Sequence, residues 1–114
     1  MNNLTQKTLE ILEDVARRQT TIAYKELYDK MGLNSEKIED RNLGAEILGE
    51  VNIISIKEKN VMISCLVGLK DTNCPSKGFF KYAIDLKRLN PNASDDEKTE
   101  FWIDEVRKAH SIYR

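Results

Sequence analysis

The sequence has few of the residues that form metal sites and disulfides. It contains two cysteines, Cys65 and Cys74, and one histidine, His110. A structural zinc site uses about four such ligands, so we expect no metal site, and no sequence motif indicates a cofactor. In a reducing compartment the two cysteines are expected to be thiols and not a disulfide.

Long hydrophobic runs are also missing. A membrane-spanning helix needs about 20 consecutive apolar residues, whereas the apolar run from Val51 to Ile56 is already broken by Asn52 and Ser55. The opening residues, 1–6, have no basic segment followed by an apolar one, which a secretory signal requires. We therefore expect a cytoplasmic protein with no membrane partner.

Charge of one sign is not in excess, because 18 basic residues face 19 acidic ones and the net charge is −1. General polyanion binders are usually basic, so that class is excluded. The charges are nevertheless segregated along the chain. Acids gather in the last predicted helix. The basic residues gather in and after one loop: Lys70, Lys77, Lys81, Lys87 and Arg88.

The chain is long enough for one domain, residues 1–114, with one hydrophobic core. Apolar spacing and capping residues predict a helix from about residue 3 to 17, and others over 24–30, 38–53, 79–89 and 94–113. Gly32 is expected to end the second helix. Ser94 and Glu97 have the spacing of a capping box at the start of the last one.

Three segments are predicted to be extended. Residues 61–67 form the clearest strand, with residues 53–57 as a hairpin partner, and residues 19–23 form a short strand or an extended turn. Gly44 and Gly49 would each cost about 1 kcal/mol inside a helix, so we expect a neighbour or ligand to approach closely there.

These elements predict an α+β fold with a winged helix-turn-helix-like core. The core covers about residues 20–89 and contains a short β-hairpin. Additional helices lie at both ends, and the C-terminal helix docks on the core.

Three motifs occur in order, at residues 21–27, 41–48 and 63–67, and the last is followed by a loop and Gly78. They read Thr-Ile-Ala-Tyr-Lys-Glu-Leu, Arg-Asn-Leu-Gly-Ala-Glu-Ile-Leu and Ile-Ser-Cys-Leu-Val. Together they resemble the DNA-binding half of the alkylguanine-DNA alkyltransferases and alkyltransferase-like proteins, over about residues 20–85. The family reads Thr-x-Tyr-x-Glu-Leu, Arg-x-Val-Gly-x-Ala-Leu and Pro-Cys-His-Arg-Val.

The resemblance implies a role in DNA binding for particular residues. Tyr24 would lie near a phosphate, Arg41 would fill the space left by a flipped base, and Gly44 would let the helix approach the minor groove. With Asn42 beside Arg41, the basic loop completes the predicted site through Lys70, Lys77 and Lys81. Two alternatives stay open: Tyr24 as a core residue, and Arg41 as part of a solvated, acid-rich helix face.

The chain departs from the family at the reactive motif, where Ser64-Cys65-Leu66-Val67 replaces Pro-Cys-His-Arg. Without a cationic neighbour a thiol keeps a pKa near ~8.5 or higher and is a poor nucleophile. We therefore expect Cys65 to be structural and the protein not to be an enzyme. The chain is also longer than the family between Arg41 and Cys65, so residues 52–60 form either a hairpin or a lengthened helix.

Our leading hypothesis is a non-enzymatic protein that binds duplex DNA through the helix near Arg41 and the basic loop. The alternative is a protein-interaction module, such as an adaptor or inhibitor of a bacterial or phage system. The acids at Glu36, Glu39 and Asp40 and those of the last helix favour that alternative. A third hypothesis, a reactive-thiol repair protein, requires Cys65 to be exposed and activated.

Overall fold

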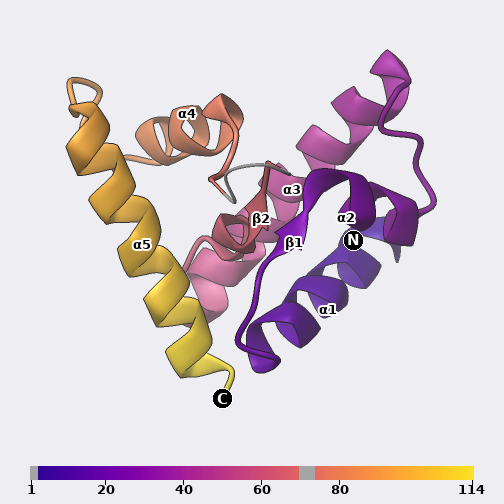
Figure 1. The fold of residues 1–114 in the computed structure, drawn as a ribbon, viewed down its shortest axis with the longest axis horizontal. Helices are drawn as coiled ribbons and strands as arrows, with labels where there is room; N and C mark the ends of the chain where they lie inside the picture. The colour runs from indigo at the N-terminus through magenta and orange to yellow at the C-terminus, as the bar shows by residue number, and fades with distance from the viewer. Residues whose placement is uncertain (1–2, 70–73) are drawn as a thin grey trace.

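Helices make up most of the chain. The computed structural model describes residues 3–69 and 74–114 (Figure 1). Its elements in chain order are α1 (Asn3–Arg17), β1 (Ile22–Ala23), α2 (Tyr24–Met31), α3 (Ile38–Lys59), the 3-10 helix η1 (Ile63–Leu66), β2 (Val67–Gly68), α4 (Lys77–Asp85) and α5 (Asp95–Ile112).

The predicted α+β winged helix-turn-helix-like core is wrong. The only sheet among the described residues is a parallel pair of two-residue strands, with Ile22 opposite Val67 and Ala23 opposite Gly68. A hairpin would be antiparallel. Residues 53–57, the predicted hairpin partner, lie inside α3.

The predicted strand at residues 61–67 is mostly the 3-10 helix η1, and only Val67 belongs to β2. All residues from Val61 to Gly68 are buried. A run buried on every side shows no alternation of apolar and polar residues, so its pattern does not distinguish a strand from a helical turn. This segment lies between α5 on one side and α1 and β1 on the other (Figure 1).

The longest element is α3, which spans 22 residues. Of the two expectations for residues 52–60, the lengthened helix is confirmed. Asn60 ends the helix in the left-handed conformation, with φ of 58°, and its N–H donates to the Ile56 carbonyl. Of the β-branched residues near its C-terminal end, which suggested a strand, Ile54 and Ile56 pack against the core, whereas Ile53 is exposed.

Several helix ends agree with prediction. Gly32 caps α2 with φ of 81°, and Ser94 and Glu97 form the capping box of α5. By contrast, α4 ends at Asp85, four residues earlier than the predicted Leu89. Lys87 follows in the left-handed conformation, with φ of 61°, which turns the chain toward α5.

The C-terminal helix α5 packs against η1. The indole N–H of Trp102 donates to the Cys65 carbonyl at 3.0 Å, and the Glu105 carboxylate accepts from the Met62 N–H at 3.1 Å. The far end of α5 reaches α1, where the Tyr113 hydroxyl donates to Glu13 Oε2 at 3.0 Å. Across residues 3–69 and 74–114, no helix combines the length and hydrophobicity needed to cross a membrane.

Candidate binding groove between α2, α3 and α4

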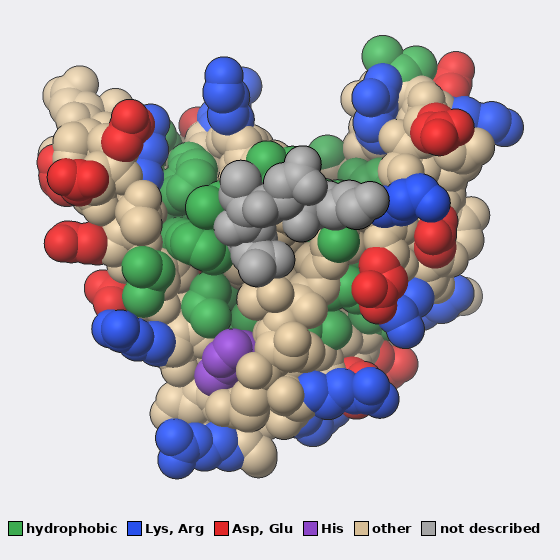
Figure 2. All heavy atoms as spheres, viewed as in Figure 1, with side chains coloured by type: hydrophobic (Ala, Val, Ile, Leu, Met, Phe, Trp, Pro, Cys, Tyr) green, Lys and Arg blue, Asp and Glu red, His purple; other side chains and the backbone are tan. Residues whose placement is uncertain are grey.

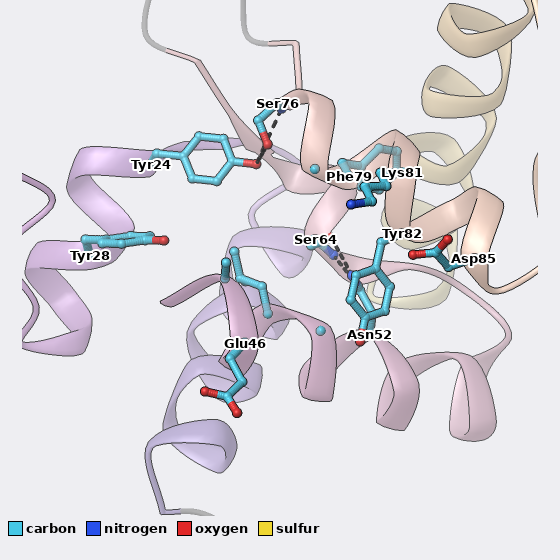
Figure 3. A pocket seen from close by; sticks show the side chains of 14 residues that line it. Tyr24, Tyr28, Glu46, Asn52, Ser64, Ser76, Phe79, Lys81, Tyr82 and Asp85 are labelled. Atoms are coloured by element: carbon cyan, nitrogen blue, oxygen red, sulfur yellow. Dashed lines mark hydrogen bonds between the residues drawn. The ribbon is translucent and has the colours of Figure 1, made fainter. Parts of the chain in front are cut away.

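Two adjoining hollows lie beside α2. The inner hollow lies between α2, α3 and α4, and the outer hollow lies between α2, the start of α3 and residues Leu69 and Ser76. The inner hollow has a volume of about 480 Å³ and the outer hollow about 600 Å³. Small-molecule sites commonly measure about 300–1,000 Å³. Residues of α2, α3, η1 and α4 line the inner hollow (Figure 3): Tyr24, Tyr28, Ala45, Glu46, Leu48, Gly49, Asn52, Ser64, Ser76, Gly78, Phe79, Lys81, Tyr82 and Asp85.

Tyr24 and Ser76 lie between the two hollows and line both. The Tyr24 hydroxyl is 3.0 Å from Ser76 Oγ and accepts from the Ser76 N–H at 3.4 Å. Ser76 is the N-cap residue of α4, yet its side chain makes no capping bond. The hydroxyl pair therefore links the start of α2 to the start of α4.

Two glycines of α3 place tyrosine rings along the groove. A Cβ at Gly44 would meet the ring of Tyr28, and a Cβ at Gly49 would meet the ring of Tyr82. This confirms the expectation that a neighbour approaches both glycines closely. Because only glycine leaves that space, each tyrosine packs directly on the α3 backbone.

Tyr28 is fixed in place by burial, by a ring contact and by a hydrogen bond. It is buried, its ring packs edge-on against Tyr24 at 6.5 Å, and its hydroxyl donates to the Arg41 carbonyl at 3.2 Å. Burial raises the pKa of Tyr28, and the nearby Tyr24 raises it further. The phenol therefore stays protonated and keeps its hydrogen bond.

A buried polar pair forms the floor of the inner hollow. Asn52 of α3 donates from Nδ2 to Ser64 Oγ at 2.7 Å, and the Ser64 N–H donates to Asn52 Oδ1 at 3.0 Å. Figure 3 shows the two bonds side by side. Both residues are buried, at 2% and 5% exposure.

Both signs of charge occur on the rims. Glu46, Lys81 and Asp85 lie at the inner hollow. At the projecting start of α3, hydrophobic, basic and acidic side chains lie together (Figure 2). The charged residues at the outer hollow are Lys25, Glu26, Asp29 and Arg41.

The structure brings together three of the predicted DNA-binding residues. Tyr24 lies between the hollows, Lys81 lines the inner one and Arg41 lines the outer one. Arg41 is exposed in the first turn of α3. These three residues therefore lie along the two adjoining hollows.

The other predicted residues lie elsewhere. Gly44 is buried beneath Tyr28. The Tyr28 ring, and not DNA, therefore makes the close approach that was predicted for the minor groove at Gly44. Asn42 is exposed on α3 and Lys77 is exposed at the start of α4, and neither lines a hollow. Lys70 lies outside the described residues.

Cys65 is fully buried and lines neither hollow. Burial raises its thiol pKa well above the usual range, and the negative charge of Glu105 raises it further. The reactive-thiol hypothesis required an exposed and activated Cys65, and the structure provides neither condition.

Sequence reasoning missed Tyr28, Tyr82, Asn52 and Ser64. Two signals were available: the glycines at 44 and 49, which required close neighbours, and a polar Asn52 within an apolar run. Neither identified the partner, because the Asn52–Ser64 contact joins residues 12 apart and the Tyr82–Gly49 contact joins separate helices.

Within the described part of the chain, no three His, Cys, Asp or Glu side chains cluster closely enough to hold a metal ion. Comparison with known proteins gives no relative, since no family model, curated protein or solved structure matches the chain. The resemblance to the alkyltransferases therefore stays a prediction.

Proposed function

We propose that the protein binds duplex DNA at the face formed by α2, α3 and α4, without chemistry, and holds one unpaired base in the inner hollow. One observation supports this proposal above the others. A hollow of about 480 Å³ is walled by aromatic rings, and cationic side chains stand at both parts of the groove.

The walls suit a planar ring. Tyr24, Phe79 and Tyr82 line the inner hollow, and stacking of a base on an aromatic side chain contributes about 1–3 kcal/mol. A base must leave the duplex to reach such a hollow. Extrusion costs least where the base is already unpaired, so we expect preference for a duplex that contains one unpaired base.

Arg41 at the outer hollow and Lys81 at the inner hollow are the cations that we propose to contact phosphates on either side of that base, and Lys25 also lines the outer hollow. Each neutralised phosphate contributes about −0.9 to the slope of log affinity against log salt. Acids lie close to both cations, so the electrostatic contribution is small for a DNA-binding protein. Affinity depends mainly on stacking and on these two contacts.

The experiment is fluorescence anisotropy with two labelled duplexes. One is fully paired, and the other has a single base opposite an abasic site. Arg41→Ala should weaken binding about tenfold and reduce the salt slope by about one. Arg107→Ala, an exposed arginine on α5, is the matched control and should leave both values unchanged. Absence of binding to either duplex at low salt would refute the proposal.

A second candidate, a protein-interaction module, is favoured by the projecting start of α3. Ile38 is 60% exposed there, beside the acids Glu39 and Asp40. A partner with a basic rim around an apolar pocket would fit this surface. If DNA binding fails, Ile38→Asp against wild type in a capture experiment tests this candidate.

A further inference from the structure

The orientation of the Asn52 amide is fixed by its neighbour. The backbone N–H of Ser64 can only donate, so the atom that faces it at 3.0 Å must be the amide oxygen. The amide nitrogen therefore faces Ser64 Oγ at 2.7 Å, and it donates there. The direction of both bonds follows without an arbitrary choice of amide rotamer.

This arrangement leaves donors without acceptors at the floor. Ser64 Oγ already accepts from Asn52, so its own proton must go elsewhere. No described residue accepts that proton, and none accepts the second Nδ2 proton of Asn52. Both side chains line the inner hollow, so these protons can be used by a ligand.

Two further kinds of polar group line the hollow: the Tyr82 hydroxyl, which lies against the α3 backbone at Gly49, and groups that lie away from the floor. The Tyr24 hydroxyl is engaged with Ser76 near the outer hollow. Glu46 and Asp85 supply acceptors, but both are exposed at the rim. The floor thus presents unfilled donors, whereas the mouth carries the acceptors Glu46 and Asp85 together with the cation Lys81.

We propose that Ser64, oriented by Asn52, is the specificity-determining residue of the groove and selects a ring whose deepest edge carries a hydrogen-bond acceptor. The inference rests on the proposed binding of an unpaired base. The edge of the base that is farthest from its sugar enters the hollow deepest. In a pyrimidine that edge carries position 4, which therefore meets Ser64 and Asn52 at the floor. Uracil presents a carbonyl oxygen there and is accepted. Cytosine presents an amino group, which leaves donor facing donor in a buried site.

The test uses two labelled duplexes that differ only in the base opposite an abasic site, uracil or cytosine. The wild type should bind the uracil duplex about tenfold more tightly. Ser64→Ala removes the hydroxyl donor and should reduce the ratio of the two affinities to about two or less.

Asn52→Asp is the sharper variant. A carboxylate accepts both from the Ser64 N–H and from the Ser64 hydroxyl, so it takes the proton that the ligand would use. The ratio should then fall to one or below. Asn42→Asp adds the same charge at an exposed position of α3 outside both hollows. It should lower both affinities by a similar factor and preserve the ratio.

The outcomes separate this inference from the proposed function. Equal affinities in the wild type, or a ratio unchanged in both Ser64→Ala and Asn52→Asp, would overturn the inference while leaving DNA binding intact. Failure of the wild type to bind either duplex would overturn both. Thermal unfolding establishes that each variant is folded, and Ser64→Ala decides the matter if Asn52→Asp does not fold.

Discussion

Buried polar groups have different roles in two parts of the molecule. One part is the packed side, where Glu105 of α5 contacts Met62, Arg88 and Lys108, and the other is the groove between α2, α3 and α4. The Glu105 carboxylate accepts from the Met62 N–H at 3.1 Å, from Arg88 at 3.0 Å and from Lys108 at 3.3 Å. The same two cations also donate to Asn60 at the end of α3. In the groove, Ser64 and Asn52 are equally buried but retain donors without partners.

A structural polar group has its hydrogen bonds filled within the protein, whereas a binding group keeps a donor or acceptor that a ligand can use. A buried carboxylate with several donors from three segments connects α5 to the rest of the fold and has nothing to offer a ligand. A buried hydroxyl with a spare proton in a hollow of suitable size can bind one. An unfilled hydrogen bond indicates a ligand site only where it faces a hollow, because Ser55 Oγ and Arg88 Nε are also buried without a partner and neither residue lines the groove.

The largest effect should come from breaking the packed side. Glu105→Ala leaves Arg88 without its buried partner, and loss of one member of a buried ion pair costs about 3–5 kcal/mol. The free energy of unfolding from urea titration measures this loss. Glu100→Ala, at an exposed position of the same helix, should change stability by less than about 0.5 kcal/mol. Equal effects of the two variants would contradict the role of Glu105.

The next effect lies at the groove wall. Gly49→Ala places a Cβ against the ring of Tyr82, and such overpacking costs about 1–3 kcal/mol. The displaced ring should also weaken DNA binding in the anisotropy experiment. Gly78→Ala is the control for the packing cost alone, because Gly78 also lines the inner hollow and its Cβ would make only an ordinary contact with Ser76 at 3.5 Å. Its helix propensity should raise stability by up to about 1 kcal/mol.

A pH effect belongs to the contact between α5 and α1. Burial and the hydrogen bond to Glu13 raise the pKa of Tyr113 from 10.0 to about 12. The folded state therefore favours the neutral phenol. Its stabilisation is complete below pH 10 and is lost as the pH rises toward 12. Tyr113→Phe should flatten the decline in unfolding free energy over this range, and an unchanged decline would contradict the assignment.

The smallest effect on stability is expected at the Tyr24–Ser76 contact, which lies between the two hollows. Tyr24→Phe removes the hydroxyl that meets Ser76, and one partly exposed hydrogen bond contributes about 1 kcal/mol or less. The ring remains, so stacking should be preserved. Urea titration should show a small loss together with DNA affinity within about twofold of wild type. A large loss of stability would place Tyr24 among the structural residues instead.

Local signals in the sequence predicted the ends of several elements. Gly32 ends α2 and the Ser94–Glu97 capping box begins α5, because both depend on neighbouring residues alone. The helical glycines also indicated close contacts at Gly44 and Gly49. Such features are readable because they follow from backbone sterics and local hydrogen bonds.

The sequence predictions were wrong where tertiary packing determines the secondary structure or the contact. Residues 53–57 are rich in β-branched side chains, yet they continue α3 because that helix is packed against several elements. β-propensity depends strongly on surroundings and does not overrule such packing. The floor of the groove was equally hidden, since only the fold brings Ser64 to Asn52.

The most direct test of the binding site is chemical-shift mapping of the ¹⁵N-labelled protein with the uracil-containing duplex. We expect the largest amide shifts at Tyr24, Ser64 and Tyr82, around the inner hollow, with little change along α5. Shifts concentrated at Ile38 and Leu43, with none at the hollow, would contradict this expectation and assign binding to the projecting start of α3.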